Sequence, residues 1–172
     1  MKLLYSIHKY DVFMFTWLLN TRVYLSLVKA SRYISKTGDG QLYVLIIALL
    51  FWQFGFENLM LKAILLAFII ERPVYFILKN TLKRNRPQAA LQNFRSTIIP
   101  SDQFSFPSGH TSAAFMMATL LGYFIPPLMI ALYCWAVIVG VSRVILGVHF
   151  PTDVMVGIVL GVSAATISLG QL

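Results

Sequence analysis

The chain has 172 residues, of which 58% are hydrophobic and 12% are charged, and its mean hydropathy is +0.75. This composition excludes an ordinary soluble globular protein, which carries about twice as much charge. The length allows one membrane domain over residues 1–172 and leaves no room for a second, soluble domain, since each span takes about 20 residues. We therefore predict an all-α, polytopic helical bundle of about five to six transmembrane helices.

The formal net charge is +8, from 14 Lys and Arg against six acids. About half of this excess is expected to lie in basic loops that anchor the protein at the membrane surface. The lone cysteine, Cys134, lies in an apolar run and cannot form an intramolecular disulfide.

Residues 1–38 alternate apolar runs with charged side chains. Such a pattern is typical of amphipathic helices that lie in the membrane interface or cover a bundle, and an additional span within this segment is left open. A turn at 35–40, with two glycines, ends the segment. Five membrane helices are predicted from the apolar runs that follow, which cover 42–54, about 59–78, 112–124, 126–146 and 153–169.

The last of these runs contains Gly157 and Gly161. Small residues at this spacing let two helices approach closely, and we interpret the pair as a packing feature. No internal repeat is visible in the sequence, so a transporter built from two similar halves finds no support.

Three polar motifs interrupt the apolar chain. They are Lys79-x6-Arg86-Pro87, Pro107-Ser108-Gly109-His110, and Ser142-Arg143-x3-Gly147-x-His149-x3-Asp153. Each spanning helix carries the chain to the other face of the membrane. The helix at 59–78 delivers the first motif to one face, where the polar stretch 88–106 keeps the chain until the second motif begins the next helix. Two helices later the third motif reaches that same face, so all three motifs are predicted to meet there.

The cations of these motifs predict a phosphate site. Lys79, Arg86 and Arg143 lie near helix ends, where an unpaired charge is costly unless an anion or water meets it. The planar fork of arginine matches phosphate oxygens, and lysine supplies a compact charge. Ser108 occupies an expected N-cap position, and Gly109 lets backbone amides approach an anion at the positive end of the next helix.

Two histidines and one carboxylate add catalytic chemistry to this site. One neutral imidazole can attack phosphorus while the other protonates the leaving oxygen. Asp153 follows His149 by four residues across Pro151, which suits the first position of a helix. We therefore predict that Asp153 orients one histidine and stabilises its charged form.

The ordered blocks KNTLKRNRP, PSGH and SRVILGVHFPTD resemble the three-part signature of the type 2 phosphatidic acid phosphatase superfamily over residues 79–153. The resemblance implies metal-independent hydrolysis of a phosphate ester or diphosphate through a phosphohistidine, with no cofactor. It implies that His149 is the nucleophile, that Asp153 orients it and that His110 is the general acid. The residues implied to bind the phosphoryl oxygens are Lys79, Arg86, Ser108, Gly109 and Arg143. Soluble vanadium haloperoxidases share the signature but are much longer and not membrane-embedded, which disfavours an oxidase.

Several further polar residues have simpler interpretations. Lys83 and Arg84 are predicted to face solvent or lipid headgroups. Glu71 and Arg72 are predicted to form a local ion pair, and Arg72 shares a helical face with Lys79, so a contact with substrate is left open. His8 is interpreted as a packing residue. A metal site made of His110, His149 and Asp153 is disfavoured, because three neighbouring cations would repel a divalent ion.

A phosphate site at helix ends in a membrane protein predicts a lipid phosphate as the substrate. We rank undecaprenyl diphosphate or a similar polyprenyl diphosphate first, glycerophospholipid monoesters such as phosphatidylglycerophosphate or phosphatidate second, and phosphoryl transfer to a second lipid third; a lipid A phosphate is a further alternative. The stretch 88–106 either covers the site or is an ordinary interfacial loop. An anionic lipid transporter is the alternative without chemistry.

Location and assembly are predicted less directly. The protein is expected to be a multi-pass protein of the cell (inner) membrane that binds no nucleic acid, and its oligomeric state is left open. Lys and Arg dominate the motif face, with Lys83, Arg84 and Arg95 beyond the site itself, and a simple charge count would make that face cytoplasmic. The family resemblance favours a periplasmic site, and we follow it because cations that bind headgroups inflate the count.

Overall fold

The computed structural model is all-α and describes residues 2–22, 24–92, 94–100 and 102–172, with the backbone alone for 2–7. Its helices are α1 (Lys2–Leu19), α2 (Tyr24–Thr37), α3 (Gly40–Phe54), α4 (Leu59–Leu82), α5 (Pro87–Ala90), α6 (Gly109–Phe124), α7 (Met129–Ile145) and α8 (Pro151–Leu169), with a 3-10 turn η1 (Pro126–Leu128). The predicted fold class is confirmed, and the predicted breaks at 126–127 and 151 fall between helices.

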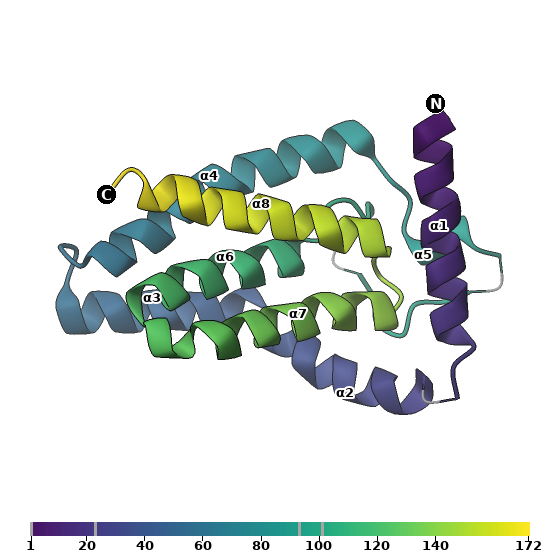
Figure 1. Ribbon diagram of the computed structural model, residues 1–172, viewed down its shortest axis with the longest axis horizontal. Coiled ribbons are helices and arrows are strands. Elements are labelled where there is room, and N and C mark those ends of the chain that lie inside the picture. Colours follow the sequence, from purple (N-terminus) through teal and green to yellow (C-terminus); the bar gives the residue numbers. More distant parts are fainter. Residues whose placement is uncertain (1, 23, 93, 101) are drawn as a thin grey trace.

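The long helices run side by side, and α1 crosses one end of the bundle (Figure 1). Helix α6 is central and packs most extensively against α8 and α7. Every residue from Thr111 to Ala118 of α6 is buried, as expected for a helix enclosed on all sides. Its alanines at 113, 114 and 118 allow neighbouring helices to come close.

Two glycines of α8 make the closest of these contacts. A Cβ atom added to Gly161 would lie 2.1 Å from the carbonyl oxygen of Ser112, and one added to Gly157 would lie 2.7 Å from that of Ser108. Both are far below a van der Waals distance, so only glycine allows α8 to approach α6 as it does. The predicted packing role of this glycine pair is confirmed.

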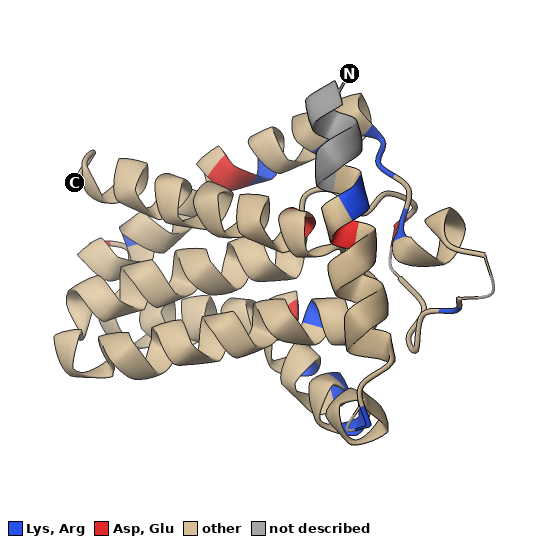
Figure 2. Cartoon of the chain, turned by 45° about the vertical axis from the view of Figure 1, so that its right-hand side comes forward, with Lys and Arg blue, Asp and Glu red and all other residues tan. Residues whose placement is uncertain are grey.

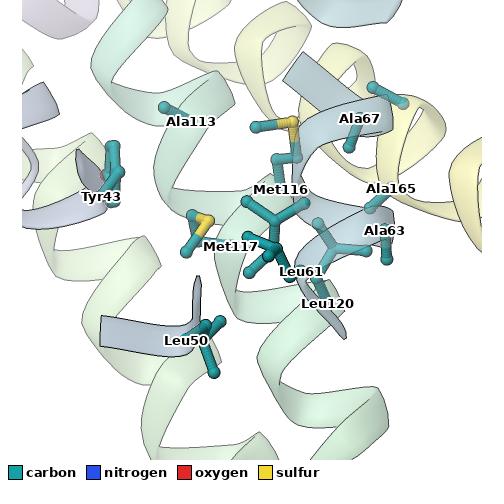
Figure 3. Packing of buried hydrophobic residues seen from close by; sticks show 12 residues of the cluster. Tyr43, Leu50, Leu61, Ala63, Ala67, Ala113, Met116, Met117, Leu120 and Ala165 are labelled. Atoms are coloured by element: carbon teal, nitrogen blue, oxygen red, sulfur yellow. The ribbon is translucent and has the colours of Figure 1, made fainter. Parts of the chain in front are cut away.

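The largest apolar cluster joins α3, α4, α6 and α8 (Figure 3). Leu61 of α4, Met116 and Leu120 of α6 and Ala165 of α8 are all fully buried in it. Tyr43 and Leu50 bring α3 into the same cluster. The cluster fixes the four helices relative to one another and so holds the helix ends that carry the polar motifs.

Three helical segments are long and apolar enough to cross a membrane by themselves: Tyr24–Phe54, Pro126–Ile145 and Pro151–Leu169. Helix α4 has 24 residues and is also long enough, but it carries charged side chains. The outer surface is apolar, with exposed Trp52, Ile69, Ile130 and Val159 directed away from the core. The number of about five to six spans stays a prediction.

Charged residues gather toward the end of the bundle where α1 lies (Figure 2). Helix α1 is held there by Asp11, which is 1% exposed and accepts hydrogen bonds from the backbone N–H of Thr152 at 3.0 Å and from Arg84 Nη2 at 2.5 Å. Helix α2 packs along α7 instead. The interpretation of 1–38 as a segment that covers the bundle therefore fits α1, whereas α2 packs along the side of the bundle, against α7.

Candidate active site

The three motifs lie at one end of the bundle, as the count of membrane crossings predicts. Helices α4 and α7 end there, and α6 and α8 begin there (Figure 1). Arg86 Nη1 of the first motif donates to the carbonyl of Val148 in the third at 2.6 Å. The N–H of Ser108 in the second motif donates to the carbonyl of Asp153 at 3.0 Å. These hydrogen bonds to backbone carbonyls hold the three motifs against one another.

The three predicted phosphate-binding cations are all buried, with 3–5% of each residue exposed. Lys79 and Arg143 lie in the last turns of α4 and α7, and Arg86 is the N-cap residue of α5. Lys79 Nζ and Arg86 Nη2 both contact the carboxylate of Asp102, at 2.7 and 2.6 Å. One anionic group therefore already binds between two of the cations.

The third cation faces a cavity of about 800 Å³. Arg143 Nη1 donates to Ser35 Oγ of α2, while its Nε has no hydrogen-bond partner among the described residues. His110 lines the same cavity, and its Nε2 lies 2.8 Å from Asp39 Oδ1. The general acid predicted from the resemblance thus lines the same cavity as Arg143, and 25% of its side chain is exposed.

The second motif lies at the start of α6, as predicted, but the Ser108 hydroxyl does not cap the helix. Ser108 is the N-cap residue of α6, but its Oγ is paired with Thr111 Oγ1 at 2.8 Å and caps no backbone N–H. A Cβ at Gly109 would lie 3.0 Å from the Tyr75 ring. Gly109 therefore makes room for Tyr75, whose hydroxyl accepts a hydrogen bond from Lys79 Nζ.

The third motif brings His149 against Asp153. Gly147 turns the chain with a φ of +75°, a conformation that glycine adopts without strain, and so directs His149 into the site. His149 is 2% exposed, and its Nδ1 lies 3.8 Å from Asp153 Oδ2, which is longer than a hydrogen bond. Burial lowers the pKa of the His149 imidazole to about 4, so the ring is neutral at pH 7.

Asp153 is fixed by two further contacts. Its Oδ2 accepts the backbone N–H of Phe150 at 2.8 Å, and its Oδ1 accepts a hydrogen bond from Arg84 Nη1 at 2.8 Å. The first contact is a reciprocal cap at the start of α8. A carboxylate held in this way presents a fixed negative charge to Nδ1 and leaves Nε2 as the free ring nitrogen.

The prediction that Arg84 faces solvent or headgroups is wrong. Its side chain is 20% exposed and bridges Asp11 of α1 and Asp153 of α8. The cause is the residue before it: Lys83 has a φ of 44°, and this left-handed turn ends α4 and directs Arg84 back over the start of α8. Lys83 itself is exposed, as predicted.

The predicted ion pair between Glu71 and Arg72 is confirmed. Glu71 is fully buried and also accepts a hydrogen bond from Ser112 Oγ of α6 at 2.6 Å. The pair is therefore not only local, because it connects α4 to α6.

Sequence reasoning missed two carboxylates of the site, Asp39 and Asp102. Both lie in loops, and neither belongs to a motif. The available signal was composition: a chain with 14 cations and six acids is expected to use its few acids near buried cations. The loop that carries Asp102 is also tied down, since the N–H of Ser105 donates to the carbonyl of Arg84 at 2.8 Å and that of Thr97 to Leu146 at 3.1 Å. It covers the motif end of the bundle.

Comparison with known proteins agrees with this arrangement. A family model described as the PAP2 superfamily matches residues 58–172. Phosphatidylglycerophosphatase B of Bacillus subtilis (strain 168) is 36% identical over 108 residues, which are 56% of this chain and 50% of that protein. Decaprenylphosphoryl-5-phosphoribose phosphatase of Mycobacterium tuberculosis is 29% identical over 102 residues, 57% of this chain and 53% of that protein.

The crystal structure of Aquifex aeolicus LpxE superimposes with a TM-score of 0.80 at 29% identity and covers 92% of this chain and 94% of that one. The chain spans about half the length of the curated relatives that it matches. Because the family model matches more than half of the chain, and because the three motifs occur in order at one end of a helical bundle, the chain belongs to the PAP2 superfamily.

Proposed function

We propose that the protein is an integral membrane lipid phosphatase that hydrolyses a phosphate monoester or diphosphate through a phosphohistidine intermediate. The observation that carries the proposal is the set of three buried cations, Lys79, Arg86 and Arg143, beside two histidines at the ends of membrane helices. Removing a charged side chain from water costs free energy, and buried cations are typical of sites where an anion compensates that cost. Phosphoryl transfer also needs this arrangement, because catalysis is mostly positioning and charge stabilisation.

The proposed chemistry gives one step to each histidine. The free Nε2 of neutral His149 attacks phosphorus, the bond from phosphorus to the lipid oxygen breaks, and His110 gives that oxygen a proton. Asp153, 3.8 Å from Nδ1, stabilises the positive charge that develops on the ring. Water then attacks the phosphohistidine with His110 as the base, which releases inorganic phosphate and restores both histidines.

Metal independence is part of the proposal. The cations that contact or face the anion site already supply the charge that a divalent ion would bring to the phosphoryl oxygens. A metal ion placed among them would be repelled. Phosphate release in the presence of a chelator therefore tests this point directly.

The decisive experiment measures phosphate release by purified protein from lipid phosphates with chelator present, for wild type, His149→Ala and His110→Asn. We expect His149→Ala to be inactive on every substrate and to form no acid-labile phosphoenzyme. His110→Asn is expected to lose lipid hydrolysis by about 10²–10⁴-fold. It should retain far more activity on p-nitrophenyl phosphate, whose leaving group needs no proton. Persistent turnover by His149→Ala would refute the nucleophile assignment, and no release from any lipid would favour a transporter.

For the substrate we propose undecaprenyl diphosphate or a similar polyprenyl diphosphate. The support is room for more than one phosphate, since cavities of about 800 and 530 Å³ meet at His110. The name of the Mycobacterium relative also specifies a decaprenyl lipid as its substrate. The Bacillus relative supports phosphatidylglycerophosphate as a second candidate by its name. Comparing kcat/KM on undecaprenyl diphosphate, phosphatidylglycerophosphate and phosphatidate ranks them, and appearance of a phosphorylated second lipid would indicate transfer.

We propose that the site faces the periplasm in the inner membrane. In a Cys134→Ser background, Ile99→Cys and Glu57→Cys place single thiols at opposite ends of the bundle, at positions whose exposed fractions are 96% for Ile99 and 93% for the Glu57 side chain. An impermeant maleimide should label Ile99→Cys in cells with a permeable outer membrane, and Glu57→Cys only after lysis. The reverse pattern would place the site in the cytoplasm and would agree with the plain charge count.

A further inference from the structure

Four buried side-chain polar atoms have no hydrogen-bond partner within the described part of the chain. Two of them, His149 Nδ1 and Arg143 Nε, belong to the phosphoryl site. The other two are Arg72 Nη2 and Tyr43 Oη. Buried polar groups are nearly always paired, so unpaired ones mark places where a ligand completes the hydrogen bonds. Of the two atoms in the phosphoryl site, His149 Nδ1 faces Asp153 at 3.8 Å, whereas Arg143 Nε is open to a ligand; Arg72 and Tyr43 add a second location.

The second pair lines one cavity of about 530 Å³. Lys79 and His110 border this cavity at its phosphoryl end, and Tyr43, Phe68 and Arg72 border it deeper in the bundle. Along α4 it extends from residue 79 to residue 68, about 16 Å at the rise of a helix. It is bounded by α3 on one side and α4 on the other, two helices that pack on each other far less than α6 packs on α8.

The guanidinium of Arg72 has one paired nitrogen and, among the described residues, one unpaired nitrogen. Its Nε is paired with Glu71, and Glu71 is in turn fixed by Ser112 Oγ at 2.6 Å. The guanidinium lies over the ring of Tyr75, with Cζ 4.9 Å from the centroid. Lys79 Nζ lies 4.6 Å from the same centroid. Arg72 and Lys79 therefore both contact the Tyr75 ring, and both line the same cavity.

The hydroxyl of Tyr43 approaches from α3. Tyr43 is 3% exposed, so its unpaired hydroxyl is enclosed rather than hydrated. A guanidinium N–H and a phenol O–H both donate hydrogen bonds, and the guanidinium adds a positive charge. Such a pair suits an anionic oxygen group better than an apolar chain.

The chemistry of the neighbouring site indicates which part of the substrate reaches this pair. His110, the proposed donor of a proton to the leaving oxygen, lines this cavity as well. His110 also lines the cavity of about 800 Å³, so both cavities are open to the group attached to the leaving oxygen, and the unpaired donors of Arg72 and Tyr43 favour this one. In a lipid diphosphate that group is the second phosphate, which is joined to the first through the bridging oxygen and is esterified to the lipid chain.

We propose that Arg72 and Tyr43 form a leaving-group subsite that binds the second phosphate of a lipid diphosphate and so determines the preference for diphosphates over monophosphates. The inference rests on the proposed function, because it uses the assigned direction of cleavage. It deepens that function by naming two residues outside the three motifs that select the substrate.

The test compares farnesyl diphosphate with farnesyl monophosphate, which have the same tail. The measured quantity is the ratio of their kcat/KM values, in detergent with chelator present. Tyr43→Phe removes one hydroxyl and keeps the ring, and Arg72→Gln removes the charge. Because Arg72→Gln leaves Glu71 unpaired, the double variant Glu71→Gln/Arg72→Gln separates lost binding from lost folding. We expect each variant to lower the ratio by about 10- to 100-fold.

Two matched controls belong to the experiment. Tyr123→Phe alters an exposed tyrosine at the far end of α6, and Lys62→Gln removes a cation at the start of α4. Both should leave the ratio unchanged. An equal loss on both substrates would assign Arg72 and Tyr43 a structural role and overturn the proposal, as would no loss on either.

Binding separates failure of this inference from failure of the proposed function. If wild type hydrolyses neither substrate, the proposed function fails, yet the advantage of farnesyl diphosphate over the monophosphate can still be measured as a difference in thermal shift. A smaller advantage in Tyr43→Phe supports the subsite in that case. An unchanged advantage refutes it.

Discussion

Asp102 competes for the groups that are proposed to bind substrate, and its replacement by asparagine should strengthen anion binding. Its carboxylate contacts Lys79 Nζ at 2.7 Å and Arg86 Nη2 at 2.6 Å. Charge-assisted hydrogen bonds contribute about 1.5–3 kcal/mol each when buried. The Asp102 side chain is 38% exposed, so we discount each contact to about 1 kcal/mol for solvent screening. Phosphate must displace both contacts, which amounts to about 2 kcal/mol, or roughly 30-fold in the dissociation constant.

The assay is a titration of inorganic phosphate against the unfolding temperature, for wild type, Asp102→Asn and the control Glu57→Gln. Without phosphate, Asp102→Asn should unfold at a lower temperature, because Lys79 and Arg86 lose their counter-charge. With phosphate it should gain more stability than wild type, since ligand bound to the folded state stabilises it by mass action. Glu57→Gln, at the opposite end of the bundle, should respond as wild type does. Weaker phosphate binding by Asp102→Asn would show that Asp102 positions the two cations rather than occupying their anion site.

Three further predictions concern packing, pH and the Arg84 bridge. Gly161→Ala should lower the free energy of unfolding by about 1–3 kcal/mol, because its Cβ would lie 2.1 Å from the Ser112 carbonyl; Gly40→Ala, with nothing within 4 Å, should not, and equal melting temperatures for the two would contradict the packing argument. Because burial lowers the pKa of His149 from 6.5 to about 4, the unfolded chain binds the extra proton first, so the free energy of unfolding should fall as the pH drops from 6.5 to 4; His149→Ala, which lacks the titrating ring, should lose less stability over this range, and an equal loss in both proteins would show that the pKa of His149 is not shifted. Arg84→Ala should lower both the melting temperature and kcat, since it removes the counter-charge from the buried carboxylates of Asp11 and Asp153, and Arg84→Lys should restore part of each; full activity in Arg84→Ala would rule out a positioning role.

The meeting of the three motifs was predictable because helices are rigid and change membrane face at each crossing. Lys79, Arg86 and Arg143 therefore had to approach Ser108 and His149 once the helices were located. Short-range geometry was also predictable, since Asp153 lies in the first turn of the helix that follows His149.

What could not be predicted depends on loops and on single dihedral angles. The left-handed turn at Lys83 has no sequence signal of the kind that glycine gives, so the return of Arg84 to the start of α8 was invisible. Asp39 and Asp102 reach the site only through the tertiary course of their loops. The pair of Glu71 with Arg72 was local and predictable, whereas its contact with Ser112 spans 41 positions.

The contact between α6 and α8 divides the site into a rigid half and an adjustable half. Ser108, His149 and Asp153 belong to two helix starts that glycines bring into backbone contact, so their spacing cannot change without separating those helices. Asp39 and Asp102 come from loops, and Tyr43 comes from α3, which packs on α4 far less extensively than α8 packs on α6. Exchange of α3 and the two loops is therefore a route to new substrates that leaves the hydrolytic half intact.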